Sequence, residues 1–340
     1  MEFRLNGLPT RFCQLELGDH VGDRSEFMFT FVVKRLIAMI PVVLAVTFVV
    51  FTIMWFVPGD PTNIILGNEW SEAASAKLKA ELGLDQTILV QFFHYIANLV
   101  QGNFGMSYIT RSPVAEQLIA RFPNTVQVVV GAMLFCVAVG VPIGVYSGVR
   151  AYSLFSNFTM VLGLLGISFP IFWLGLLLIL LFSVYLRWLP SSGLEDGFAS
   201  LILPSLALGS NYMANIMRIT RSSMLEVIRQ DYIRTAKAKG VKARDVVVKH
   251  ALQNSMMPTI TVIGMDVGTL LGGVVLTETV FSIPGTGRLL VESINKRDTP
   301  TVLGCLVIMA ICIAVSNLIV DIVYAYVDPR IKAQYGGGKD

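Results

Sequence analysis

The chain has 340 residues, of which 54% are hydrophobic and only 14% are charged. Soluble domains carry about a quarter charged residues, so this composition indicates that about half of the chain lies in lipid. The net charge of +3 is too low and too scattered for a nucleic-acid-binding protein.

The histidines and cysteines, which often build catalytic and metal sites, are not spaced as in known motifs of either kind. The three histidines are isolated, and the four cysteines have neither paired nor metal-ligand spacing. The sequence holds no GxxxxGK[ST] phosphate-binding loop and no GxSxG nucleophile motif. We therefore expect no catalytic residue, no metal site and no cofactor bound by this chain. Asp60, in the string PGDP, is interpreted as a turn residue.

The N-terminal residues lead into a first predicted transmembrane helix. Residues 1–27 are polar and lack the apolar run of a signal peptide. They are predicted to be a flexible cytoplasmic tail, or the product of an upstream start codon that is not used, with Met28 as the natural start. Residues 28–57 hold the first span, from about Val32, which exceeds the roughly 20 residues that a bilayer requires.

Residues 58–122 are polar and too long for a turn, so they are predicted to form a small helical cap outside the membrane. Within this cap, helices are expected at 72–82 and 87–100, and a turn-rich break at 102–107.

Residues 123–332 are predicted to be a membrane core, and residues 333–340 a second cytoplasmic tail. Five further spans are expected, at 125–149, 158–186, 201–217, 259–281 and 302–327. Pro170 interrupts the third span of the chain. The fourth contains several serines and asparagines, so it must face protein rather than lipid. The predicted fold is thus an all-α membrane protein with six transmembrane helices.

The distribution of basic residues predicts the orientation of these spans. With a cytoplasmic N-terminus, 18 of the 26 lysines and arginines lie on the cytoplasmic side. This bias places both termini and the loop 218–258 in the cytoplasm. The cap at 58–122 then faces the outside.

The loop 218–258 holds nine of the 26 basic residues. Leu225, Ile228, Tyr232 and Ala236 recur at helical spacing and predict one amphipathic helix, which Gly240 ends. A second short helix is expected over 243–252, so the loop would form a rigid knob. The knob either touches anionic lipid or enters a groove in another protein. The small residues Thr235, Ala236 and Ala238 favour the protein groove.

The same loop carries a resemblance to a known family. The string DYIRTAKAKG at 231–240, followed by HALQN, resembles the cytoplasmic EAA loop of ABC importer permeases, in the dipeptide, oligopeptide and nickel branch. The later Leu-Pro pair of the loop is absent, which is typical of this branch. Three further strings match, VPGDP at 57–61, LTETVFSIPGTGRLL at 276–290 and NLIVDIVYAYVDPRI at 317–331.

The resemblance implies a transport subunit in the bacterial plasma (inner) membrane, not an enzyme. It implies that the chain forms half of a pathway for di- or oligopeptides, alongside a homologous second permease and an external substrate-binding protein. Two cytoplasmic ATPase subunits, which use ATP and Mg²⁺, would bind the knob. The residues implied in coupling to the ATPases are Asp231, Tyr232, Arg234, Thr235, Ala236, Lys237, Ala238, Lys239 and Gly240.

The predicted fifth span carries Gly264, Gly268 and Gly272 at four-residue spacing, which lets another helix approach closely. We expect this stripe to pack near the partner permease, with packing inside the subunit as the alternative. Asp266 points away from the stripe. It faces either the aqueous pathway or a polar residue of the fourth span, such as Asn211 or Asn215.

Three other functions are weighed against the peptide importer. The same machine importing nickel or glutathione shares these motifs. A proton-coupled secondary transporter would use Asp266 and Asp321 as relays, but its inverted repeats are absent from the sequence. A membrane enzyme needs a nucleophile or a metal cluster, and the sequence shows neither.

Overall fold

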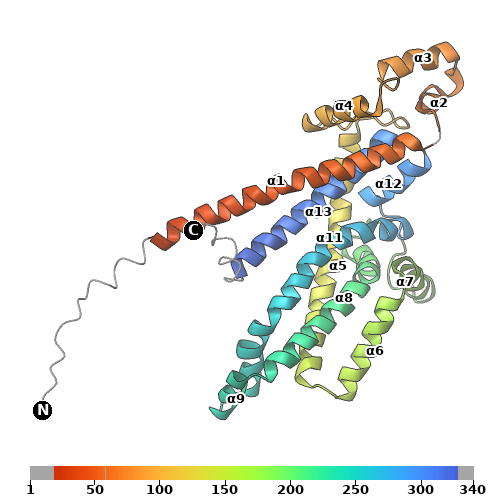
Figure 1. Ribbon diagram of the computed structural model, residues 1–340. Helices are drawn as coiled ribbons and strands as arrows, with labels where there is room; N and C mark the ends of the chain where they lie inside the picture. Colours follow the sequence, from red (N-terminus) through yellow and green to blue (C-terminus); the bar gives the residue numbers. More distant parts are fainter. Residues whose placement is uncertain (1–18, 58, 328–340) are drawn as a thin grey trace, which may run out of the picture.

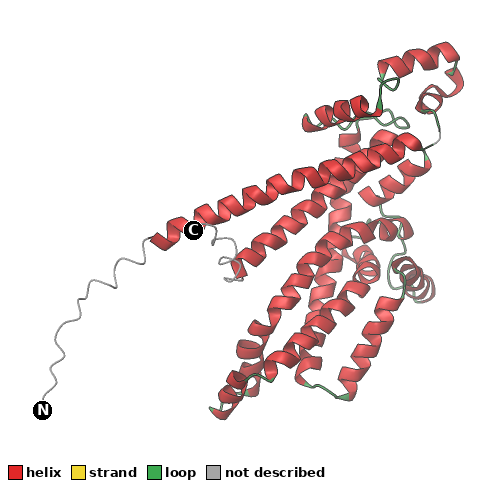
Figure 2. Ribbon diagram, viewed as in Figure 1, coloured by secondary structure: helices red, strands yellow, loops and turns green. Residues whose placement is uncertain are grey.

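The computed structural model describes residues 19–57 and 59–327. This part of the chain is helical, with a single isolated β-bridge between Met106 and Pro113 (Figure 2). Five long helices form the body of the molecule (Figure 1): α1 (Asp19–Phe56), α5 (Val114–Val149), α8 (Phe198–Ile228), α11 (Gln253–Val280) and α13 (Thr299–Val327).

Shorter helices lie between the long ones. The cap contains α2 (Pro61–Leu66), the 3₁₀ turn η1 (Gly67–Glu69), α3 (Glu72–Glu81) and α4 (Ile88–Val100). The segment between α5 and α8 contains α6 (Leu154–Ser168), α7 (Ile171–Leu178) and the π-helix η2 (Ile179–Tyr185). The remaining short elements are α9 (Asp231–Ala238), α10 (Ala243–Asp245), the π-helix η3 (Val246–Leu252) and α12 (Thr286–Asn295).

Four described stretches are long and apolar enough to cross a membrane: Val32–Phe56, Val114–Val149, Ala243–Val280 and Thr299–Val323. The pair α6 and α7–η2 counts as a fifth span if the two halves cross together, although they are bent by 107°. The predicted fourth span coincides with α8. Its buried side includes Ser200, Ser205 and Thr220, which confirms that this helix faces protein.

The tightest helix contact in the body joins α5 to α8. It uses a glycine stripe, defined by Gly140, Gly144 and Gly148 of α5. A Cβ atom at Gly144 would lie 2.6 Å from the carbonyl oxygen of Met217 on α8. The two backbones therefore touch directly, as small residues at this spacing permit.

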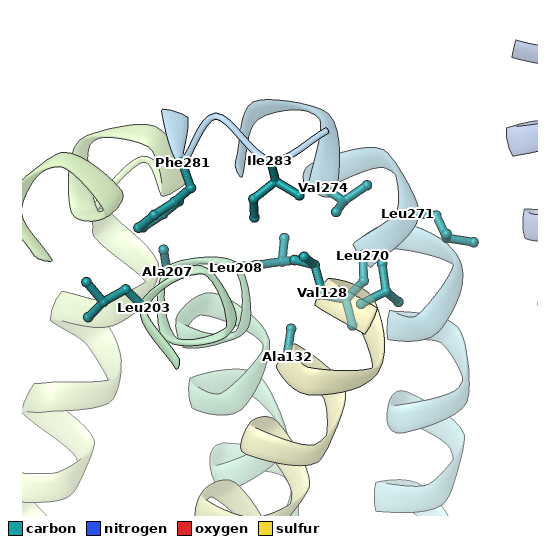
Figure 3. Close-up of a cluster of buried hydrophobic side chains, with 11 residues drawn as sticks. Val128, Ala132, Leu203, Ala207, Leu208, Leu270, Leu271, Val274, Phe281 and Ile283 are labelled. Atoms are coloured by element: carbon teal, nitrogen blue, oxygen red, sulfur yellow. The ribbon is translucent and has the colours of Figure 1, made fainter. Parts of the chain in front are cut away.

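A cluster of buried apolar side chains joins α5, α8 and α11 near the α12 end of the bundle (Figure 3). Val128, Leu208, Leu270 and Val274 meet in its centre, and Phe281 and Ile283 close it from the loop after α11. α1 lies outside this core, beside α13 (Figure 1), and Arg35 of α1 pairs with Asp321 of α13 at 3.0 Å. Between Leu36 and Phe56, most of the exposed side chains of α1 are apolar.

Several predicted boundaries are wrong. The first predicted span, from about Val32, agrees with the apolar stretch Val32–Phe56, but the helix that contains this stretch, α1, begins earlier, at Asp19. The predicted tail 1–27 therefore loses its last nine residues to the helix, and residues 1–18 lie outside the described part. α5 begins at Val114 and includes Pro123, which the prediction placed before the helix.

The predicted interruption of the third span at Pro170 is confirmed, and it divides the span into two helices, α6 and α7. Phe169 and Pro170 are extended, with ψ of 129° and 138°, because a proline disfavours helical geometry in the residue before it. The helices predicted within the cap are present as α3 and α4. α2 and α12 were not predicted from the sequence.

Candidate coupling site at the α8–α9 corner

The knob is built from the ends of α8 and α11 with α9 between them. α8 ends at Ile228, Gln230 is extended with ψ of 149°, and α9 then runs to Ala238. Gly240 follows with φ of +77°, a left-handed conformation that glycine adopts without strain. The predicted end of this helix at Gly240 is confirmed.

The single amphipathic helix predicted across this loop is wrong. The chain breaks after Ile228, so the helical phase restarts at Asp231. Ile233 is consequently the buried residue of α9, with 0% of its surface exposed, and Tyr232 is 44% exposed. The second short helix is also wrong, since α10 and η3 continue into α11 without a break.

A small hydrophobic core fixes the knob to the bundle. Ile233 packs with Met224 of α8, Val246 and Ala251 of η3, and the half-buried Ala236. Residues from α8, α9 and η3 thus share one core, so α9 is held by α8 and by the helical segment that continues into α11. A force on α9 passes to both helices because packed interiors deform little.

Polar contacts reinforce this attachment one or two turns into the bundle. The Arg221 Nε donates to Ser156 Oγ of α6 at 3.1 Å. The hydroxyls of Thr220 and Thr259 lie 3.1 Å apart, and Ser223 Oγ donates to the Ser255 carbonyl at 2.8 Å. These contacts connect α8 to α6 and to α11.

The outward face of the knob is small and basic. Eight of the nine predicted coupling residues are exposed, and Ala236 is the exception. Arg234 lies 3.6 Å from Asp231, and Lys249 lies 3.2 Å from Asp245. Lys237 and Lys239 have no ion pair among the described residues, so the face carries unneutralised positive charge.

The glycines predicted for a subunit interface pack mostly inside the chain. A Cβ atom at Gly264 would lie 2.7 Å from Val320 of α13, and one at Gly268 would lie 3.4 Å from Asn317. At Gly272 such an atom meets nothing described within 4 Å. The alternative of packing within the subunit therefore holds for Gly264 and Gly268, and Gly272 remains on an open surface.

Asp266 does point away from these glycines, but toward protein. It is 8% exposed and close enough to Cys136 of α5 and Tyr212 of α8 for its charge to act on both. Its Oδ2 atom has no hydrogen-bond partner in the described part of the chain, and neither has Oδ1 of Asn211. The predicted alternative of a bond to Asn211 or Asn215 is therefore not formed.

Two structural joints escaped the sequence analysis. Glu278, fully buried at the end of α11, accepts a hydrogen bond from the Arg288 N–H in the first turn of α12 at 2.9 Å. The second joint is the α5 glycine stripe. Its four-residue spacing was visible in the sequence and is the same signal that drew attention to α11.

Asp60 has the turn role that was predicted. Its carboxylate caps α2 by accepting the Thr62 N–H at 3.0 Å and pairs with Lys79 at 2.6 Å. Burial raises the pKa of Asp60, but the hydrogen bonds from Lys79 and Thr62 and the charge of Lys79 outweigh it, so the pKa lies below its ordinary value. In residues 19–57 and 59–327, no group of three or more His, Cys, Asp or Glu residues is placed to hold a metal ion.

Comparison with known proteins agrees with this architecture. Residues 140–333 match the family model for the binding-protein-dependent transport system inner membrane component, and residues 28–129 match its N-terminal companion. The chain is 42% identical to the dipeptide transport system permease protein DppB of Escherichia coli K12, over 90% of this chain and 99% of that protein. It is also 42% identical to the glutathione transport system permease protein GsiC of Salmonella typhimurium, with the same coverage. The chain therefore belongs to the binding-protein-dependent transport system inner membrane component family, the permease subunits of ABC importers.

Proposed function

We propose that this chain forms half of the translocation pathway of an ATP-driven importer of di- and oligopeptides. The observation that carries the proposal is the knob, in which the small, basic face of α9 is anchored through Ile233 to α8 and α11. Similarity to a dipeptide permease over 90% of the chain supports the peptide substrate.

The proposed machine contains a homologous second permease, two cytoplasmic ATPases that use ATP and Mg²⁺, and an external substrate-binding protein. When the ATPases close on ATP, α9 moves with them as part of a rigid corner. α8 and α11 then tilt, and the pathway opens on the opposite side of the membrane. The chain binds no cofactor of its own in this scheme, and the external protein selects the substrate.

The proposed topology has six spans, with α6 and α7–η2 counted as a broken third span and α8 as the fourth. It places both termini and α9 in the cytoplasm of a bacterial cell and the cap outside. Two observations support it. α9 and the cap helices α2–α4 lie at opposite ends of the bundle (Figure 1), and 18 of the 26 basic residues then fall on the α9 side.

Coupling is tested by enlarging the exposed face of α9. Ala238→Trp adds a bulky side chain to that face, and we expect the complex to insert normally but to lose copurification of the ATPases. Ala73→Trp is the matched control, because Ala73 is an exposed alanine on α3 in the cap. Full ATPase retention and normal transport in Ala238→Trp would refute the coupling role.

The substrate is tested by uptake. Cells that lack this chain should lose uptake of labelled dipeptides, and plasmid-borne wild-type chain should restore it. Glutathione is the second candidate, because the chain is equally similar to a glutathione permease. Loss of glutathione or nickel uptake with normal dipeptide uptake would reassign the substrate, and uptake driven by a proton gradient without ATP would exclude the whole scheme.

A further inference from the structure

A cavity of about 890 Å³ lies between the cap and the body. Its walls come from the last turns of α1, the cap helices α2, α3 and α4, and the start of α13. Cavities of about 300–1,000 Å³ are the size that proteins use for small ligands. The coupling function does not use this cavity, because the cap helices that line it lie at the opposite end of the bundle from α9 (Figure 1).

Most of the lining is apolar. Phe51, Met54 and Trp55 of α1 form one side. Leu78 of α3 and Leu303 of α13 also line the cavity, and the Tyr95 hydroxyl is buried without a hydrogen-bond partner among the described residues. A ligand with a large apolar part is required to fill such a space favourably.

The charged groups of the lining are predominantly basic. Lys79, Arg111 and Arg297 reach the cavity, and Asp60 is the only carboxylate among the described lining residues. Lys79 already neutralises Asp60 at 2.6 Å. Arg111 donates to the Ile65 carbonyl, and Arg297 has no ion pair among the described residues. The cavity therefore offers positive charge to an anion.

This charge pattern disfavours a short peptide. A zwitterionic peptide brings an ammonium group as well as a carboxylate, and the ammonium needs an acidic partner when it leaves water. Asp60 is engaged by Lys79 and caps α2. An amphiphile with one negative head and an apolar body fits the lining better.

The cavity lies at the end of a membrane span, within reach of membrane lipids, which are amphiphiles of this kind. Phe51, Met54 and Trp55 stand at the end of the first span, where Val32–Phe56 leaves the membrane. Leu36, Ile40, Leu44 and Phe48 are exposed along the span, on the same side of α1 as Phe51, Met54 and Trp55, so this flank is apolar. An acyl chain lying along this flank leads to the cavity, and the basic groups of the lining lie just beyond the end of the span, where a bilayer has its headgroups.

We propose that this cavity binds an anionic phospholipid from the leaflet next to the cap. Its acyl region packs against Phe51, Met54 and Trp55, and its phosphate pairs with Arg297. The site rests on the membrane placement of α1 and not on the identity of the imported substrate.

Photocrosslinking tests the proposal on the purified complete importer. The probe is phosphatidylglycerol with a photoreactive acyl chain, and the labelled peptides are located by mass spectrometry. We expect labelled peptides within residues 51–65 and 78–108. Arg297→Ala should reduce the labelling about tenfold, which corresponds to the loss of one charge-assisted contact. Lys296→Ala is the matched control, because Lys296 is exposed, adjacent and outside the lining.

Three results would overturn the proposal. The first is that Arg297→Ala is labelled as strongly as the wild type. The second is that the phosphatidylcholine analogue labels the protein as strongly as phosphatidylglycerol does. The third is that a zwitterionic dipeptide prevents the labelling. A second variant, Leu78→Trp, fills the space without changing charge and should also reduce labelling. Labelling is measured without transport, so the two proposals are tested separately. A negative labelling result would not contradict peptide import, and a negative peptide-uptake result would not contradict lipid binding in this cavity.

Discussion

The carboxylate of Asp298, just before α13, accepts a hydrogen bond from the backbone N–H of Tyr108 in the cap at 2.9 Å. Its other oxygen accepts the hydroxyls of Ser107 and Thr301. Asp298 is 3% exposed, so one buried side chain joins two segments separated by 190 residues. It fixes the cap to the helix that packs beside α1.

Asp298→Ala should loosen the cap. Each buried donor left without a partner costs about 1–3 kcal/mol, and the change affects three donors. We expect faster amide hydrogen exchange over residues 105–113, with exchange in α8 unchanged. Asp85→Ala is the control, since Asp85 is an exposed acid of the same cap. Equal exchange in Asp298→Ala and wild type would show that the joint does not hold the cap.

The ion pair of Asp60 with Lys79 should make the cap sensitive to acid. The pKa of folded Asp60 lies below its ordinary value of 3.8. Its contribution to stability is therefore present above pH 3.8 and is lost as the pH falls through the lower, folded value. Lys79→Met should destabilise the cap at neutral pH and have a smaller effect as the pH falls below 3.8, measured by protease cleavage between α2 and α3.

The matched control for this prediction is Lys77→Met, because Lys77 pairs weakly with Glu81 at 3.8 Å on the exposed side of the same helix. If Lys79→Met has the same effect at both pH values, the Asp60 charge does not stabilise the cap.

The α5 glycine stripe should not tolerate a methyl group. Alanine is normally about 1 kcal/mol better than glycine within a helix. At Gly144 its Cβ would lie 2.6 Å from a backbone carbonyl, and such overpacking costs about 1–3 kcal/mol. Gly144→Ala should lower the melting temperature of the purified complex, whereas Gly272→Ala, which has open space, should not. A similar melting temperature in both variants would contradict the close contact with α8.

Asp266→Asn should leave transport unchanged. The side chain is buried against α5 and α8 with an unpartnered oxygen, so removing its charge should keep or raise stability. Uptake of cationic and neutral peptides and the melting temperature are the measurements. Asp321→Asn is the contrasting variant, because it breaks an ion pair with Arg35 and should lower stability. Slower uptake of cationic peptides alone by a stable Asp266→Asn complex would restore the pathway hypothesis.

The sequence by itself predicted the all-helical class, the first and the last two apolar helices, and the cap helices α3 and α4. These features depend on local quantities. Long apolar runs determine which helices enter lipid, and Gly240 ends a helix because of its own backbone freedom. The family also followed from the sequence, since its motifs are contiguous strings.

Tertiary contacts decided the rest. Pro170 breaks its span as the sequence predicted, but Pro123, which precedes the apolar run of the second predicted span, lies inside α5, because neighbouring structure determines whether a freed backbone group is satisfied. Two glycine stripes had the same spacing, but only the one on α5 meets another helix backbone. Ile233, and not the predicted Tyr232, is buried in the core, because the break at Gln230 shifts the helical phase of α9. The spacing of apolar residues cannot reveal this break, because the break arises where the ends of α8, α9 and the helix leading into α11 pack together.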